Sequence, residues 1–308
     1  MVSRSTRRKA QDYAATHGTN YTTALRAVTN EIHHRSTKNT LRLELGHTNN
    51  DQSFHINLDR HNRSHLVGFK INHAQTQRFI WSTSEQAATQ GYAVSYYPHL
   101  GSENDEVFLA QLHAKARQIS EHVDGFISVS NFPHGEILDE ITTRYRWLQE
   151  HPNTNNLFDK DSATDTKPQF RPKLIIAETS QTYSQEFSEV ATLGRSVGIH
   201  LILLLDNPLL LKPEDRGNFT TTIMLINPRT SGKEITSFTD HWGSALGAKP
   251  TPEQTKRWNE RASTYKSWSQ VFEEQPTSEN QQHHEKQQRF TLLVKTPHQT
   301  TLHEIIES

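Results

Sequence analysis

The segment 199–205 reads Ile-His-Leu-Ile-Leu-Leu-Leu and carries the strongest strand signal of the chain. A continuous apolar run of this length is typical of a strand that is buried on both faces, as in a parallel sheet covered by helices. The polar stretch Asp206-Asn207-Pro208 separates it from the next apolar residues, and no run of 18 apolar residues exists in the sequence. The segment therefore predicts an interior strand and not a membrane span.

Apolar strand patterns alternate with helical patterns on both sides of this segment. Alternation of this kind implies βαβ units, and so an α/β fold with a mainly parallel sheet and helices on both faces. A hairpin is predicted at 41–45 and 54–58. Further strands are predicted at 65–67, 92–97, 125–129, 173–177, 221–226 and 289–295, and helices at 75–89, 106–121, 133–149 and 184–194.

Composition divides the 308 residues into three predicted parts. Residues 1–38 are predicted to form a small basic helical hairpin around His17-Gly18-Thr19, and residues 39–250 the α/β domain. Residues 251–308 hold a predicted helix, a polar linker and a possible last strand. Because only 32% of all residues are apolar, we also expect polar stretches outside the core, including a flexible insertion at 151–170.

The charge is near neutral overall but uneven along the chain. The protein has 33 Lys and Arg against 34 Asp and Glu, whereas residues 1–45 carry eight basic and three acidic residues, a net charge of +5. The basic hairpin is thus a nucleic-acid or partner-docking arm or, equally, a solvated helix pair that packs on the main body. Candidate nucleic-acid contacts are Arg7, Arg8, Lys9 and Arg26.

The absence of cysteine excludes disulfides, thiolate metal sites and a cysteine nucleophile. Nineteen histidines are present, but the pairs at 33–34, 61 and 65, and 283–284 lack a second pair at ligand spacing, so we predict no metal site. The basic N-terminus leads into no apolar stretch, which argues against a secretory signal. These features together predict a cytoplasmic location.

The segment after the predicted strand 65–67 is where a doubly wound sheet would bind a ligand. A phosphate-binding loop has the pattern Gly-x4-Gly-Lys-Ser/Thr, whose amides wrap the phosphates. Here the segment reads Gly68-Phe-Lys70-Ile-Asn72-His73-Ala74-Gln75-Thr76. The first Gly is present, but His73, Ala74 and Gln75 replace the second Gly, the Lys and the hydroxyl residue. This segment alone does not predict a phosphate loop.

Residues 173–208, KLIIAETSQTYSQEFSEVATLGRSVGIHLILLLDNP, resemble the FtsK/SpoIIIE family of DNA-pumping ATPases, which includes the EccC-like secretion ATPases. Residues 194–201 match the family segment Gly-Arg-Ser-x-Gly-Ile/Val-His-Leu, and Pro208 stands at the family proline. The resemblance extends over residues 40–250 and implies a P-loop NTPase (RecA-like) fold. It also implies that Gly68, Lys70, Asn72, Gln75 and Thr76 form the nucleotide loop.

The chain departs from the family at the residues that handle ATP and magnesium. The family Asp-Glu pair becomes Ala177-Glu178, and the Thr-Gln sensor becomes Asp206-Asn207. Glu178 is either a general base or a helix-capping or salt-bridging residue. Lys70 either replaces the lost loop lysine or faces solvent. Arg195 is either an arginine finger toward a neighbouring subunit or an anchor for the helix end.

We therefore expect a degenerate, pseudo-ATPase member of the family for which ATP and magnesium are disfavoured. Its expected role is DNA binding, segregation or plasmid transfer as a partner of an active motor, and the resemblance implies a homo-oligomer. Two alternatives remain open: an active ATP-hydrolysing translocase with an unusual loop, and a protein-binding adaptor that uses the motor fold as a scaffold. Gly68 and Gly198 are predicted to occupy turns.

Overall fold

The computed structural model describes residues 8, 11–15, 21, 24, 40–48, 51–58, 65–70, 73–99, 105–130, 135–150, 170–179, 185–206, 210–211, 213–226, 250–264, 291–295 and 303–306. The chain divides into two compact units, Met1–Thr40 and Leu41–Ser308. In the first unit Arg8, residues 11–15, Tyr21 and Ala24 are helical. The predicted turn at 17–19, the candidate contacts Arg7, Lys9 and Arg26, and nearly all of the predicted insertion lie outside the described residues.

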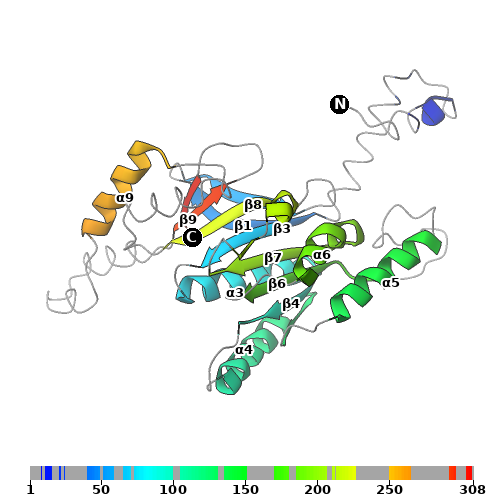
Figure 1. The fold of residues 1–308 in the computed structure, drawn as a ribbon, viewed down its shortest axis with the longest axis horizontal. Coiled ribbons are helices and arrows are strands. Elements are labelled where there is room, and N and C mark those ends of the chain that lie inside the picture. Colours follow the sequence, from blue (N-terminus) through cyan, green and yellow to red (C-terminus); the bar gives the residue numbers. More distant parts are fainter. Residues whose placement is uncertain are drawn as a thin grey trace. The chain divides into compact units, whose positions relative to one another are not determined.

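The second unit is built on one ten-stranded sheet with the order β2-β1-β10-β9-β8-β3-β7-β6-β4-β5 (Figure 1). Six neighbouring strands are parallel, which confirms the predicted α/β fold. They are β8 (Phe219–Ile226), β3 (His65–Lys70), β7 (Ile199–Leu205), β6 (Lys173–Thr179), β4 (Ala93–Tyr97) and β5 (Phe126–Val129).

The other four strands extend the sheet beyond β8 in antiparallel fashion. The predicted hairpin is present as β1 (Leu41–Thr48) and β2 (Ser53–Leu58), and the predicted last strand as β9 (Thr291–Lys295). The sequence patterns did not predict β10 (His303–Ile306), which lies between β9 and β1. Backbone pairing within the sheet therefore links the hairpin to the parallel strands through β10 and β9.

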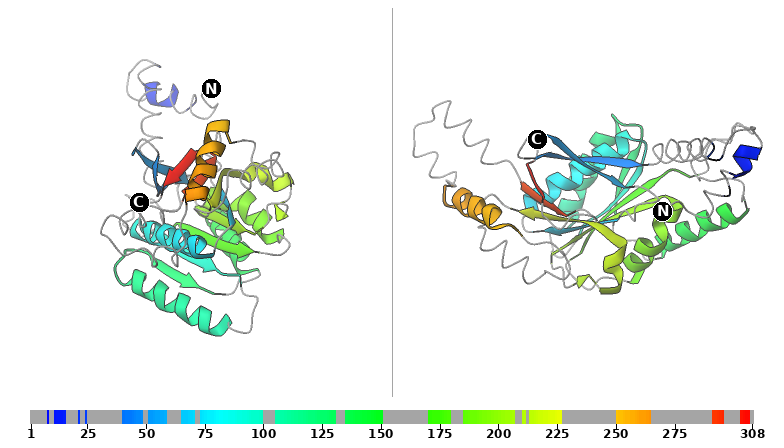
Figure 2. Two further views of the ribbon diagram at one scale, coloured as in Figure 1. Left: turned by 90° about the vertical axis from the view of Figure 1, so that its left-hand side faces the viewer. Right: turned by 90° about the horizontal axis from the view of Figure 1, so that it is seen from above.

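Helices cover both faces of the sheet (Figure 2). Residues of α3 (His73–Thr89) and α4 (Asp105–Ser120) share one buried cluster with Ile176 of β6 and Leu204 of β7. Residues of α5 (Glu136–Glu150), α6 (Gln185–Leu193) and α9 (Pro252–Thr264) share the other cluster with Leu203. Two short 3-10 helices, η1 (Gly194–Val197) and η3 (Pro213–Asn218), precede β7 and β8.

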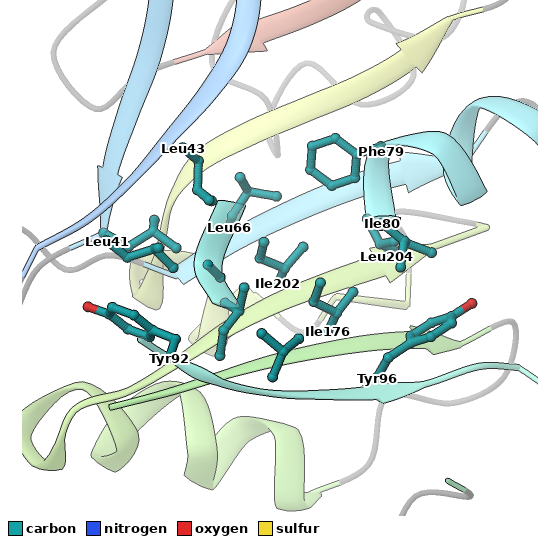
Figure 3. Packing of buried hydrophobic residues seen from close by; sticks show 14 of the residues in the cluster. Leu41, Leu43, Leu66, Phe79, Ile80, Tyr92, Tyr96, Ile176, Ile202 and Leu204 are labelled. Carbon is teal, nitrogen blue, oxygen red and sulfur yellow. The ribbon is translucent and has the colours of Figure 1, made fainter. Parts of the chain in front are cut away.

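The central strand β7 shows why its sequence is apolar throughout. All seven residues are buried; Leu201, Leu203 and Leu205 belong to the cluster beneath α5 and α6, whereas Ile202 and Leu204 belong to the cluster beneath α3. Figure 3 shows the second cluster, in which Leu41 and Leu43 of the hairpin meet the strand residues. Among the described helices, none combines the length and the apolar character that crossing a bilayer requires.

Candidate functional site at the carboxyl edge of the sheet

The carboxyl ends of β3, β4, β6 and β7 lie along one edge of the sheet. The strand register shows this directly, because Phe69 and Thr179 both pair with Leu205, and Tyr97 pairs with Ala177. Ligands of doubly wound sheets bind beyond this edge, so it is the place to look for a nucleotide site.

The strand β3 is longer than predicted and continues through Lys70. Gly68 pairs with Leu204 on one side and with Ile223 on the other, so the prediction that it occupies a turn is wrong. The flanking strands supply backbone partners that keep residues 68–70 extended. A Cβ atom at Gly68 would lie 2.5 Å from Cδ2 of Leu204, so the glycine makes room for core packing.

The connection from β3 to α3 is short, because the strand ends at Lys70 and the helix begins at His73. Lys70 is a strand residue and not a loop residue, which corrects the predicted position; its side chain and Asn72 lie outside what the structure describes. Gln75 and Thr76 lie in the first turn of α3 with 3% and 0% of their surface exposed. Both side chains are therefore covered by protein.

Three side chains at this edge form a hydrogen-bonded group, which we call the carboxylate cluster: Gln77 of α3, Tyr96 of β4 and Glu178 of β6. The Gln77 amide donates to the Tyr96 hydroxyl at 2.9 Å and to Oε1 of Glu178 at 3.4 Å. The Tyr96 hydroxyl also donates to Oε1 of Glu178. Oε1 is thus engaged by two donors from two neighbouring elements.

The environment of Tyr96 keeps its hydroxyl protonated. Burial raises its pKa, and the charge of Glu178 and the hydrogen bond to that carboxylate raise it further. The ring also packs edge-on against Trp81 with 5.8 Å between the centroids. Tyr96 is therefore a fixed hydrogen-bond donor toward Glu178.

The residue before Glu178 faces a different environment. Ala177 is fully buried in the cluster beneath α5 and α6, where it pairs with Tyr97 and Leu203. At the end of the next strand, Asp206 is exposed, and its amide donates to the Thr179 carbonyl at 3.4 Å. Asn207 lies outside the described residues.

Sequence reasoning selected Glu178 but missed Tyr96 and Gln77, although Tyr96 is a polar residue near the carboxyl end of an apolar strand.

Arg195 and Gly198 lie at the opposite edge of the sheet, in and directly after η1. Gly198 has a φ of 71° and ends η1, so its predicted turn position is confirmed. Because η1 leads into the first residue of β7, Arg195 is separated from the carboxylate cluster by the length of the strand. Arg195 therefore does not approach Glu178 of its own chain, and its role toward a neighbouring subunit stays a prediction.

Within the described part of the chain, no three His, Asp or Glu residues gather closely enough to hold a metal ion. The carboxylate cluster contains one carboxylate, one amide and one phenol. Such a group can hold hydrogen-bond donors and polarise a bound hydroxyl, but it supplies neither a cation for phosphate nor a second carboxylate for magnesium.

Comparison with known proteins places this geometry in a structural context. No family model and no curated protein matches the sequence. Among solved structures, the cytoplasmic domain of the type VII secretion ATPase EccC of Thermomonospora curvata aligns with 88% of this chain at a TM-score of 0.52 and 14% identity. The fold is that of FtsK/SpoIIIE-type ATPase domains. The predicted resemblance to this family is thus confirmed at the level of the fold.

Two further solved structures align with the chain at lower scores. The pCW3 conjugation coupling protein TcpA, solved with ATPγS, aligns with 87% of this chain at a TM-score of 0.48 and 12% identity. The DNA-packaging ATPase B204 from Sulfolobus turreted icosahedral virus aligns with 80% at a TM-score of 0.38 and 13% identity. The chain spans 29% of the EccC structure and 66% of TcpA, so it corresponds to only part of each.

Proposed function

We propose that this chain is a pseudo-ATPase of the FtsK/SpoIIIE type, which binds DNA and acts in DNA segregation or plasmid transfer as a partner of an active motor. The observation that carries the proposal is the connection from β3 to α3. A phosphate loop needs a stretch of backbone amides that is free to wrap the phosphates. Here Gly68 and Phe69 are paired on both sides in the sheet, Lys70 is paired with Leu225 of β8, and α3 begins at His73.

The carboxylate cluster supports the same conclusion. Oε1 of Glu178 accepts hydrogen bonds from Tyr96 and Gln77. These contacts stabilise the charged carboxylate and make it a weaker base toward an attacking water. The magnesium carboxylate of the family is replaced by the buried methyl group of Ala177. Each lost charge-assisted contact removes about 1.5–3 kcal/mol from nucleotide binding.

The DNA part of the proposal rests on the N-terminal charge. Residues 1–45 have a net charge of +5, and the helical residue Arg8 is exposed. Clustered basic residues attract the phosphate backbone of DNA through counterion release, which makes the affinity depend steeply on salt. A mixed oligomer would bring this arm together with a motor that hydrolyses ATP.

Calorimetry with magnesium-ATP, ADP and a nonhydrolysable analogue tests the loss of nucleotide binding. We expect no binding up to millimolar nucleotide and no phosphate release. Micromolar affinity would overturn the pseudo-ATPase assignment. If phosphate release is detected and Glu178→Gln abolishes it, the chain is an active ATPase with an unusual loop.

Anisotropy of a short fluorescent DNA duplex tests the arm. The intact chain is compared with a chain that lacks residues 1–36 and with Arg8→Ala over a salt series. We expect the deletion to abolish binding, Arg8→Ala to weaken it, and the affinity to fall as salt rises. DNA affinity that survives the deletion would contradict the arm as the contact. If the chain that lacks residues 1–36 loses a protein partner but keeps its affinity for DNA, the adaptor function is favoured.

A further inference from the structure

Two glutamines, Gln86 of α3 and Gln90 directly after its last residue, bind the backbone of β1 in the way that a neighbouring strand would. The Gln86 amide accepts from the Glu44 N–H at 2.7 Å and donates to the Glu44 carbonyl at 2.9 Å. The Gln90 amide accepts from the Arg42 N–H at 3.0 Å and donates to the Arg42 carbonyl at 2.7 Å. We call this pair the glutamine clamp.

The clamp has the spacing of a β-ladder. Residues four apart on a helix have Cβ atoms about 5–6 Å apart, and alternate residues of a strand lie about 6.7 Å apart, so the two amides meet two backbone groups on one side of β1. Among the described residues, β1 pairs with β10 only at His47 and Thr48. At Arg42 and Glu44 the clamp therefore supplies the hydrogen bonds of a missing strand.

The other end of the same helix reaches the carboxylate cluster. Gln77, in the second turn of α3, donates to Tyr96 and Glu178. Between the two ends, Phe79, Ile80 and Ala87 are buried against the sheet (Figure 3 labels the first two). A 17-residue helix is about 25 Å long and behaves as a stiff rod.

We propose that α3 is a lever that couples the β1–β2 hairpin to the carboxylate cluster. The clamp fixes the C-terminal half of α3 to β1, the first strand after the unit Met1–Thr40. A shift of the hairpin moves the helix, and the 3.4 Å contact between Gln77 and Glu178 is the longest hydrogen bond of the cluster and breaks first. That DNA binding to the N-terminal arm shifts the hairpin is the one part of this proposal that rests on the proposed function.

Amide hydrogen exchange of the full chain tests the coupling. The double variant Gln86→Met/Gln90→Met keeps the length of both side chains but removes the acceptors of the Arg42 and Glu44 N–H groups together with the amide donors to their carbonyls. We expect amides of these two residues to exchange at least about tenfold faster, and those of residues 76–80 and of Tyr96 to exchange faster as well. The matched control is Gln111→Met/Gln118→Met, at two exposed positions of α4.

Coupling must also work in reverse, because linkage between two sites is reciprocal. Tyr96→Phe, which removes one donor from the cluster, is therefore expected to speed exchange at Arg42 and Glu44. Two results would overturn the lever. One is that the Gln86/Gln90 double variant speeds exchange only in β1 and in the last turn of α3. The other is that Tyr96→Phe has no effect on exchange in β1. Unchanged protection of α4 and β5 verifies that each variant is folded. The experiment uses neither nucleotide nor DNA, so its outcome is independent of whether the chain binds either.

Discussion

Acidification is expected to destabilise this protein through one buried histidine. His65 is fully buried in β3, where Nδ1 accepts the Leu201 amide at 2.9 Å, so the neutral ring carries its proton on Nε2. Burial is the largest cause that lowers the pKa of His65 from 6.5 to about 3. Repulsion from His200 and Arg195 lowers it further, and the backbone of Ala191 acts in the opposite direction. The folded chain therefore keeps this ring neutral in mildly acidic solution.

The sign and size of the effect follow from proton binding. Below pH 6.5 the unfolded chain binds a proton at His65 that the folded chain does not bind, so the free energy of unfolding falls as the pH falls. The slope approaches about 1.4 kcal/mol per pH unit, and the integrated loss between pH 7.5 and pH 5 is about 2 kcal/mol. No loss from this group is expected above pH 7.5, where it is neutral in both states.

Urea unfolding followed by circular dichroism at pH 7.5, 6.5, 5.5 and 5 measures this loss. His65→Asn is the reference variant, because the asparagine oxygen can still accept the Leu201 amide while the side chain no longer titrates. The difference in unfolding free energy between the two proteins should shrink by about 2 kcal/mol from pH 7.5 to pH 5. Since all other titrating groups are common to both proteins, a difference that stays constant over this range would refute the reasoning.

Five further substitutions have expected outcomes in the same unfolding assay. Gly68→Ala should cost about 1–3 kcal/mol, because the new methyl group meets the end of the Leu204 side chain. Gly125→Ala should destabilise the protein more, because its new methyl group meets backbone atoms at 2.2–2.8 Å. Gly217→Ala, with no atom within 4 Å, should be nearly neutral, and a loss as large as that of Gly125→Ala would contradict the packing argument. Arg144→Ala should cost more than about 2 kcal/mol, because the buried guanidinium donates to the Val197 and Arg171 carbonyls and to Glu140, and the two carbonyls lose this donor. Lys256→Ala breaks only an exposed pair at 3.9 Å and should cost less than about 1 kcal/mol. Equal losses for these last two variants would show that burial does not decide the strength of the pairs.

The parallel core was predictable because its strands are buried on both faces. Residues 199–205 are continuously apolar for that reason, and the observed β7 has these bounds. The helices around it could be located from their spacing to within a few residues; for example, α3 begins at His73 where the pattern predicted 75. In these elements the local sequence and the tertiary environment favour the same conformation.

The features that the sequence did not predict depend on which strands become neighbours. Gly68 fits both a loop and a strand, and only the pairing with β7 and β8 makes it extended. The carboxylate cluster needs β4 beside β6 with α3 above them, an arrangement that no spacing pattern records. The four residues of β10 are too few to show an alternation.

The pairing of β1 with β10 has a consequence for the order of events during synthesis. His47 leaves the ribosome 259 residues before Ile306, so this part of the sheet cannot close until that intervening length has been made. An open strand edge in a nascent chain invites wrong pairing and aggregation. Gln86 and Gln90 are synthesised soon after the hairpin, and their side chains can bind the edge of β1 at Arg42 and Glu44 before β9 and β10 are made.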